Sequence, residues 1–223
     1  MGAGGPARDH PAWAGQAVYT PGVLALYDFF VLGVSNRWVW RCPTEGLLAL
    51  YDAHVSACHL EVGVGTGYFL DRCRFPTAHP AITLLDLNPT PLAKAARRIA
   101  RFQPRTQIAN LLEPLPLAPN SFDSIGLNYV LHCLPGTIAS KAVALASLRA
   151  LLRPGGVLFG STLLGRGGER SLAARGLMAL YNARGIFSNR EDDQAGLERA
   201  LGAHFGRFEI RLLGCGALFV AYA

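Results

Sequence analysis

The pattern of hydrophobic and polar positions changes its period near residue 57. From there on, short apolar runs alternate with longer segments whose apolar residues recur every three or four positions. The first pattern is typical of buried strands and the second of amphipathic helices. We predict strands at 58–62, 81–86, 106–110, 124–128 and 156–162. We predict helices near 68–73, 90–102 and 137–151, the second of them capped by Thr90 ahead of Pro91.

Strands that alternate with helices indicate βαβ units and a parallel sheet covered on both faces. The end of the chain departs from this order, since FEIRLL (208–213) and ALFVAYA (217–223) are separated only by Gly214-Cys215-Gly216. Parallel neighbours need a long crossover, so these two strands should pair antiparallel as a hairpin. The prediction is an α/β fold in which five parallel strands are followed by a C-terminal antiparallel hairpin.

The chain before residue 57 is predicted to be helical after an irregular start. Residues 1–18 show no period and should form a flexible arm. Thr20 before Pro21 is an N-cap and N1 pair that should open an apolar helix, and a second helix is expected at 44–55. Because 51% of the 223 residues are hydrophobic, residues 19–223 can bury the core of a single domain.

Several functional classes are disfavoured by composition. The opening MGAGGPARDHPAW has no basic segment leading into an apolar one, so we expect no secretory signal. The longest apolar stretch contains Asp28 and is too short to cross a bilayer. The five cysteines are odd in number and form no CxxC pair, so neither a disulfide framework nor a zinc site is predicted. We expect a cytoplasmic protein with no membrane span and no bound metal.

The formal net charge of +6 raises the question of a nucleic-acid partner. The densest basic segment is KAARRIARFQPR, in which Lys94, Arg97, Arg98 and Arg101 follow helical spacing. These four residues would share one face of a helix, and a solvated outer face explains them more simply than a binding surface. We therefore expect no nucleic-acid partner.

The segment EVGVGTG (61–67) joins the first predicted strand to the helix that follows it. A dinucleotide fingerprint would need a glycine at Tyr68, and a phosphate-binding Walker loop would need a Gly-Lys pair that is absent. What remains is an acid followed by glycines at 63, 65 and 67. Asp86, about 20 residues beyond the loop, has the spacing of an acid that binds ribose hydroxyls. The pocket therefore suits an adenosine whose attached tail is not a pyrophosphate.

With these motifs the sequence resembles the class I S-adenosylmethionine-dependent methyltransferases. The resemblance covers residues 57–165 and rests on four motifs in order: LEVGVGTG, LLDLNPTPLAKAARR, FDSIGLNYVLHCLPG and LLRPGGVLFGST. It is closest to small-molecule enzymes of the ubiquinone/menaquinone-biosynthesis type. It implies a Rossmann-like seven-stranded sheet, S-adenosylmethionine as cofactor and S-adenosylhomocysteine as product.

The resemblance also implies roles for individual residues. Gly63, Gly65 and Gly67 should let the backbone approach the methionine part of the cofactor. Glu61 should accept a hydrogen bond from the α-amino group, and Asp86 from the ribose hydroxyls. The remaining expected cofactor contacts are Leu87 on the adenine face, Asn110 at the adenine amino group in place of the family's usual aspartate, its neighbour Leu111, Asn128 at the methionine end, and Tyr27 or Tyr19 facing the sulfonium.

Methyl transfer from a sulfonium needs a side-chain base only when the nucleophile holds its proton tightly. His132, after the fourth strand, is the first candidate for that base, against the alternative of a histidine satisfied by the protein. Tyr129 and Cys133 are weaker catalytic candidates. Residues 19–56 should form a helical lid, and the insertion 165–190 should close an apolar acceptor pocket.

The predicted function is methyl transfer to a small, largely apolar metabolite, with oxygen ahead of nitrogen, sulfur or carbon. One alternative is an enzyme of the same fold that binds the cofactor but catalyses a cyclisation or rearrangement. Another is a nucleic-acid methyltransferase, although the N-P-P-[YF] signature is missing at Asn128-Tyr129-Val130-Leu131. The acceptor's identity and the formation of a homodimer are left open by the sequence.

Overall fold

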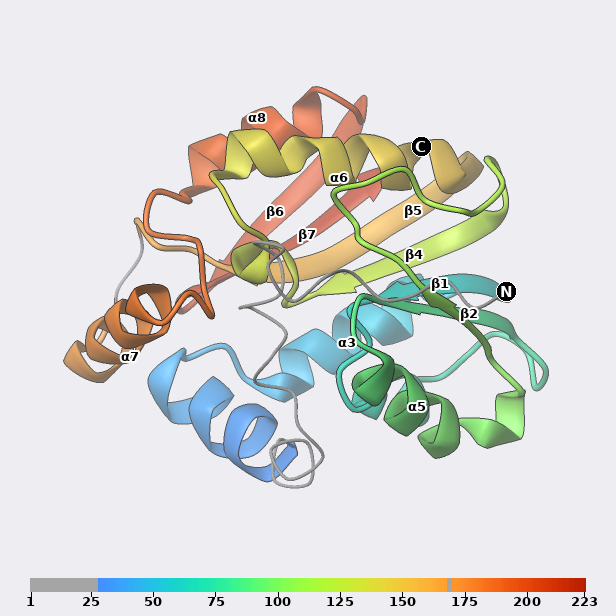
Figure 1. The fold of residues 1–223 in the computed structure, drawn as a ribbon, viewed down its shortest axis with the longest axis horizontal. Coiled ribbons are helices and arrows are strands. Elements are labelled where there is room, and N and C mark those ends of the chain that lie inside the picture. The colour runs from blue at the N-terminus through green and yellow to red at the C-terminus, as the bar shows by residue number, and fades with distance from the viewer. Residues whose placement is uncertain (1–27, 168–169) are drawn as a thin grey trace.

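The computed structural model of the chain describes residues 28–167 and 170–223. One seven-stranded sheet runs through it in the order β3-β2-β1-β4-β5-β7-β6 (Figure 1). The strands are β1 (Cys58–Val62), β2 (Ala81–Asp86), β3 (Arg105–Ile108), β4 (Phe122–Asn128), β5 (Leu152–Leu163), β6 (Arg207–Leu213) and β7 (Gly216–Tyr222). The first five strands pair in parallel, and β7 pairs antiparallel with both β5 and β6. The predicted fold class is confirmed.

Helices cover both faces of this sheet (Figure 1). They are α3 (Thr44–His54), α4 (Tyr68–Arg72), α5 (Pro89–Arg98), α6 (Ile138–Leu151), α7 (Leu172–Ala183) and α8 (Gln194–Gly202). Short 3-10 turns form η2 (Ala100–Phe102) and η3 (Leu131–Cys133), and a π-helix forms η1 (Asp28–Val39). Within the described ranges, no helix is both long and apolar enough to cross a membrane.

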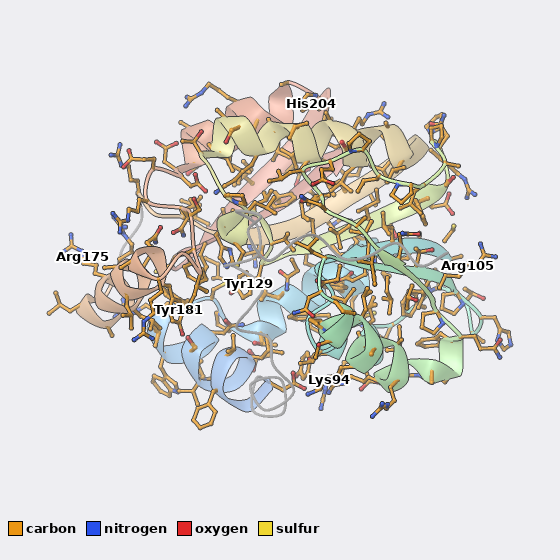
Figure 2. The ribbon with its side chains drawn as sticks, viewed as in Figure 1. Lys94, Arg105, Tyr129, Arg175, Tyr181 and His204 are labelled. Carbon is orange, nitrogen blue, oxygen red and sulfur yellow. The ribbon has the colours of Figure 1, made fainter. Side chains whose placement is uncertain are left out.

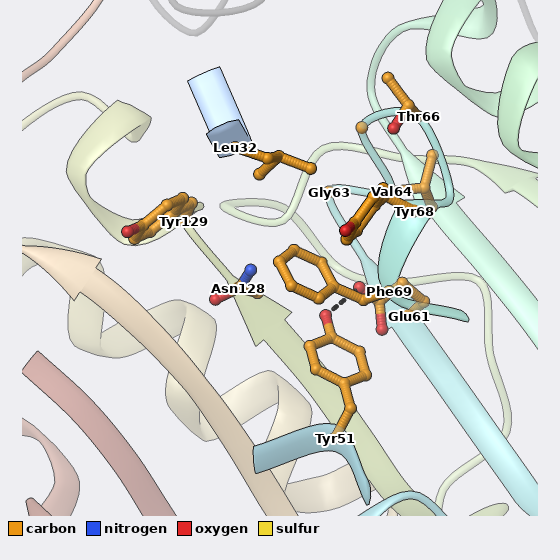
Figure 3. A pocket seen from close by; sticks show the side chains of 11 residues that line it. Leu32, Tyr51, Glu61, Gly63, Val64, Thr66, Tyr68, Phe69, Asn128 and Tyr129 are labelled. Atoms are coloured by element: carbon orange, nitrogen blue, oxygen red, sulfur yellow. Dashed lines mark hydrogen bonds between the residues drawn. The ribbon is translucent and has the colours of Figure 1, made fainter. Parts of the chain in front are cut away.

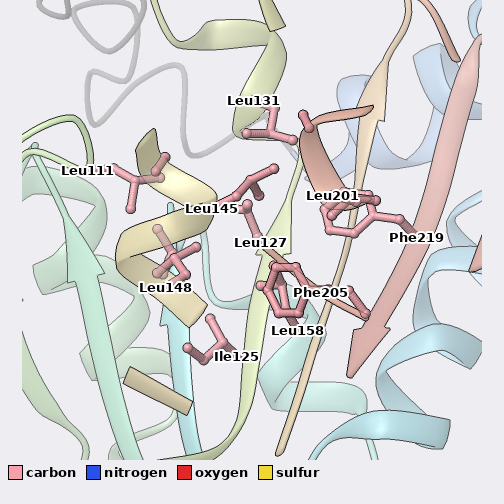
Figure 4. Close-up of a cluster of buried hydrophobic side chains, with 14 of the residues drawn as sticks. Leu111, Ile125, Leu127, Leu131, Leu145, Leu148, Leu158, Leu201, Phe205 and Phe219 are labelled. Carbon is pink, nitrogen blue, oxygen red and sulfur yellow. The ribbon is translucent and has the colours of Figure 1, made fainter. Parts of the chain in front are cut away.

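The core has one apolar layer on each face of the sheet. Between the sheet and α6 and α8, Leu127 of β4 packs with Leu145, Leu148 and Leu201 (Figure 4). On the other face, the layer under α3 and α5 includes Tyr51, which is fully buried. Both layers come from apolar residues at helical spacing set against near-continuous apolar strands, as expected for a sheet buried on both sides.

Several predicted boundaries were wrong. The third strand ends at Ile108, not at position 110, which leaves Asn110 in the turn that follows. Helix α5 begins at Pro89, and its N-cap is Asn88, whose side chain accepts the Thr90 N–H at 2.9 Å. The helix pattern expected to reach 102 is broken at Ile99, after which η2 follows. Residues 1–18, Tyr19, the helix start at Thr20-Pro21 and Tyr27 lie outside the described residues.

Candidate active site

The candidate site lies where β1 and β4 are neighbours at the centre of the sheet. From these two strands the chain continues to opposite sides, which is where ligands bind in open α/β sheets. A pocket opens there at the carboxyl ends of the strands (Figure 3). It is lined by Leu32, Tyr51, Glu61, Gly63, Val64, Gly65, Thr66, Tyr68, Phe69, Asn128 and Tyr129.

The three loop glycines all adopt left-handed backbone conformations, with φ of +70°, +52° and +74° at Gly63, Gly65 and Gly67. A Cβ on Gly63 would lie 2.3 Å from the side chain of Val130, and one on Gly67 would lie 3.0 Å from the backbone of Ala95. A Cβ on Gly65 would meet no protein atom within 4 Å. Gly63 and Gly67 are therefore needed for packing, whereas Gly65 leaves its backbone open toward the pocket.

Asp86 holds the glycine loop from the end of β2. Its Oδ2 accepts the Val64 N–H at 3.1 Å, and its Oδ1 accepts the Asn88 N–H at 2.9 Å. Burial raises the pKa of Asp86 to about 6, and the backbone N–H groups of Asn88, Val64 and Leu87 offset part of that rise. Each carboxylate oxygen still has a lone pair for a further donor. Leu87, the next residue, is half-buried.

Glu61 lies at the floor of the pocket, with 5% of its surface exposed. Its Oε1 accepts the hydroxyl of Tyr51 at 2.5 Å, and its Oε2 lies 3.0 Å from Nε2 of His59 (Figure 3 draws the bond from Tyr51). Tyr51 comes from α3, where its ring packs edge-on against Phe159 of β5. The sequence pattern marked Tyr51 only as an apolar position of a helix, so its hydroxyl contact with Glu61 was missed.

Asn110 and Leu111 lie in the turn after β3, and neither lines the pocket. The Asn110 side-chain oxygen accepts the Leu112 N–H at 3.1 Å, and its amide nitrogen donates to Glu113 at 2.7 Å. Leu111 is buried in the apolar layer below α6. In the structure these two side chains therefore build the turn and the core.

Asn128 and Tyr129 form the wall of the pocket opposite the glycine loop. The Asn128 side-chain oxygen accepts the hydroxyl of Ser161 on β5. Tyr129 has φ of +59°, a conformation that bulky residues rarely adopt. Its N–H donates to the Ser161 carbonyl at 2.8 Å, which fixes the backbone where β4 ends. Figure 2 shows Tyr129 between the sheet and Tyr181 of α7.

His132 is 3% exposed and does not line the pocket. Its Nδ1 accepts the Leu163 N–H at 3.2 Å, and its ring packs edge-on against Phe187 with 4.5 Å between centroids. Burial lowers the pKa of His132 to about 3, with a smaller contribution from Lys141. An imidazole with its basic nitrogen already occupied and so low a pKa is a poor proton acceptor. The structure therefore fits the alternative of a histidine satisfied by the protein, and we do not assign the base to His132.

The predicted lid divides into two parts with different positions. Helix α3 packs on the sheet and supplies the pocket floor through Tyr51. Helix η1 carries Leu32 to the pocket, and Asp28 at its start accepts the hydroxyl of Thr66 in the glycine loop at 2.5 Å. Asp28 also pairs with Arg98 of α5 at 2.6 Å. Thus Arg98, expected on a solvated face, connects η1 to the cofactor side of the sheet.

The insertion 165–190 contains α7, and its two ends are held at α6. Lys141 is fully buried and its Nζ lies 2.6 Å from both the Ser188 carbonyl and Oδ2 of Asp192. The carbonyl of Asp192 accepts the N–H groups of Gly165 and Arg166. Next to this anchor, Met178, Tyr181 and Phe187 pack in an apolar cluster that reaches Tyr129. The insertion thereby places an apolar surface beside the pocket wall.

Comparison with known proteins identifies the family of this chain. Residues 60–158 match the family model described as a methyltransferase domain. Demethylluteothin O-methyltransferase of Streptomyces thioluteus is 44% identical over 208 residues, covering 93% of this chain and 90% of its own. The physcion biosynthesis cluster O-methyltransferase of Aspergillus chevalieri is 38% identical over 213 residues, covering 95% and 96%. The chain belongs to the S-adenosylmethionine-dependent methyltransferases.

Solved structures of this methyltransferase fold superpose well at low identity. A Haemonchus contortus phosphoethanolamine N-methyltransferase 2 bound to S-adenosylhomocysteine gives a TM-score of 0.67 at 16% identity, covering 91% of this chain and 46% of that one. A geranyl diphosphate methyltransferase bound to sinefungin gives 0.57 at 15%, covering 80% and 75%. The prediction of an enzyme that transfers a methyl group from S-adenosylmethionine to a small molecule is confirmed.

Proposed function

We propose that this methyltransferase methylates a hydroxyl oxygen of a small, largely apolar acceptor. The observation that carries the cofactor's placement is the open backbone at Gly65, which lines the pocket with Glu61 and belongs to the loop that Asp86 holds through the Val64 N–H. A cationic amino acid joined to a ribose needs acceptors at both ends and a bare backbone between them. The residues present fit S-adenosylmethionine.

In this proposal each acid binds one end of the cofactor. Glu61 accepts from the α-ammonium, and Asp86 accepts from the vicinal ribose hydroxyls through its free lone pairs. Asn128 faces the methionine part, and Leu87 borders the adenine. Asn110 and Leu111 would not contact the adenine with their side chains; they would shape the turn beside it. The contact of Tyr27 with the sulfonium stays a prediction, because Tyr27 lies outside the described residues.

When bound, the cofactor supplies a methyl group on a sulfonium, which is already an activated leaving group. The protein's task is to align the acceptor oxygen and to exclude water. Leu32 and the ring of Tyr129 would form the walls that exclude it, and the apolar side chains of α7 would contact the acceptor. Tyr129 would thus act through its ring, which lines the pocket, since its hydroxyl is buried in the protein.

Two ionisable side chains that line the pocket, Tyr51 and Glu61, are already hydrogen-bonded to each other. Burial and the neighbouring Glu61 raise the pKa of Tyr51 well above its usual value, and Tyr51 already donates to that carboxylate. We therefore propose an acceptor hydroxyl acidic enough to ionise without a protein base, such as a phenol or an enol. The O-methyltransferase names of the two relatives support oxygen as the methylated atom.

The test uses labelled S-adenosylmethionine with a series of phenols and enols of different acidity. We expect label on oxygen, and we expect the pH of half-maximal rate to follow the pKa of each acceptor. A midpoint that stays constant across the series would instead indicate a protein base. Acceptor consumption without label in the product would support cyclisation or rearrangement. Calorimetry that detects no binding of S-adenosylhomocysteine below millimolar concentration would contradict the proposed cofactor site.

The same preparation addresses two further proposals. A gel-shift at physiological salt should show no retained nucleic acid, which would exclude the basic alternative. Sedimentation velocity should establish whether the chain forms a homodimer.

A further inference from the structure

A buried chain of hydrogen bonds continues from Glu61 away from the pocket. His59, two residues earlier on β1, has no exposed surface, and its Nε2 lies 3.0 Å from Oε2 of Glu61. Its Nδ1 lies 2.8 Å from the hydroxyl of Ser124 on β4. Ser124 in turn accepts the Ser56 N–H at 3.0 Å. With Tyr51 on its other oxygen, the Glu61 carboxylate is held from two sides.

The direction of the central hydrogen bond follows from the chemistry of the groups. An ionised carboxylate can only accept, so Nε2 of His59 must carry the proton that faces Glu61. The short contact between the Tyr51 hydroxyl and Oε1, 2.5 Å, has the length of a charge-assisted bond to a carboxylate. Glu61 is therefore a carboxylate that receives a donor on each oxygen and keeps one lone pair on each for a ligand.

The neighbouring strand β4 leaves space for the side chains of His59 and Glu61. Gly126 of β4 lies directly opposite Glu61, and a Cβ there would lie 2.3 Å from Oε2 of Glu61 and 3.3 Å from the ring of His59. The ring of His59 stacks on Phe159 with 5.8 Å between centroids and meets Phe75 edge-on. The ring can neither turn nor be displaced without disturbing these neighbours.

We propose that His59 is a positioning residue that holds the Glu61 carboxylate toward the α-ammonium of the bound cofactor. This inference rests on the proposed cofactor site. A free glutamate side chain has three rotatable torsions, and ordering such a side chain on binding lowers the affinity for the ligand. His59 and Tyr51 remove that loss of affinity in advance, and Ser124 and Gly126 keep His59 in place.

Two ligands separate this role from a purely structural one. S-adenosylhomocysteine carries the α-ammonium, whereas 5′-methylthioadenosine has the same adenosine and thioether but lacks the amino-acid group. We would measure both dissociation constants by calorimetry for the wild type, His59→Phe, His59→Gln and Ser124→Ala. The exposed His79→Gln is the matched control.

We expect His59→Phe to raise the dissociation constant of S-adenosylhomocysteine at least tenfold and that of 5′-methylthioadenosine less than twofold. His59→Gln, whose amide can still donate to Glu61, should recover at least half of the loss on a logarithmic scale. Equal weakening of both ligands, or no weakening, would overturn the proposal. If His59→Phe does not fold, Ser124→Ala tests the proposal in its place: it too should weaken binding of S-adenosylhomocysteine more than binding of 5′-methylthioadenosine. A wild type that binds neither ligand would instead contradict the proposed cofactor site itself.

Discussion

Replacing Lys141 by methionine should destabilise this protein strongly. Lys141 and Asp192 are 0% and 1% exposed, and their charged atoms lie 2.6 Å apart. Burial lowers the pKa of Lys141 and raises that of Asp192, and each charge opposes the shift of the other. Removing one member of a buried pair costs about 3–5 kcal/mol, because the remaining charge is left without a partner. For a domain of this size that corresponds to a loss of roughly 6–20 °C in melting temperature.

A second variant separates lost charge pairing from lost packing. Asp192 also accepts the Ile138 N–H at 2.9 Å, so Asp192→Asn keeps an acceptor at the start of α6 while removing the charge. The double variant Lys141→Met with Asp192→Asn should regain more than half of the lost stability. Thermal and urea unfolding of the single and double variants at pH 8 would measure this.

The single variant should also depend on pH in a defined direction. Without Lys141, the folded-state pKa of Asp192 rises further above its unfolded value. A carboxyl with a raised folded pKa destabilises the folded state as pH rises from the unfolded pKa through the folded one. The deficit in melting temperature should therefore be smaller at pH 5 than at pH 8. A deficit below about 1 kcal/mol, one unchanged between these pH values, or a double variant no better than the single would refute the argument.

Two further predictions concern the cofactor loop. Gly65→Ala should weaken S-adenosylhomocysteine binding at least tenfold and lower the melting temperature less than Gly63→Ala does, because both positions have a positive φ but the Gly65 Cβ meets no protein atom. Gly63→Ala should lower the melting temperature more, because its Cβ meets Val130. Melting temperatures and calorimetric affinities of both variants would test this. A greater loss of stability in Gly65→Ala and a greater loss of affinity in Gly63→Ala would contradict the placement of the pocket. Because the pKa of Asp86 is raised to about 6, the dissociation constant of S-adenosylhomocysteine should rise as pH falls below 6, and a flat titration from pH 8 to 5 would exclude Asp86 as the ribose acceptor.

The architecture could be predicted because its elements are long and strongly periodic. Apolar runs such as 124–128 are buried on both faces, so their pattern reflects the sheet directly. The three residues between the two predicted C-terminal strands allowed only an antiparallel hairpin, and the pairing of β6 with β7 confirms it. Boundaries were harder, since Asn88-Pro89 and Thr90-Pro91 both fit the start of a helix. The Asn88 side chain caps the backbone there, so the helix begins at the earlier pair.

The candidate site could be located from sequence but not assembled from it. The glycine loop and Asp86 can be recognised from their spacing along the chain. The contacts that orient Glu61 cannot be recognised in this way, because Ser124 is 65 residues from His59 and belongs to another strand. His132 shows the opposite error: a histidine after a central strand suggests a base, and only its burial reveals that the protein already uses its nitrogen.

The contact between Asp28, Thr66 and Arg98 bears on how firmly η1 is held beside the cofactor loop. Both charged side chains retain about a quarter of their surface in solvent, 30% and 24%. A partly exposed ion pair contributes about 1 kcal/mol, and on its own a contact of that strength is broken in roughly one molecule in six. This ion pair is therefore a weak connection between η1 and the glycine loop, whereas buried Leu32 and Asn36 hold the rest of η1. Raised salt, which screens the pair, would weaken this connection beside the cofactor loop further.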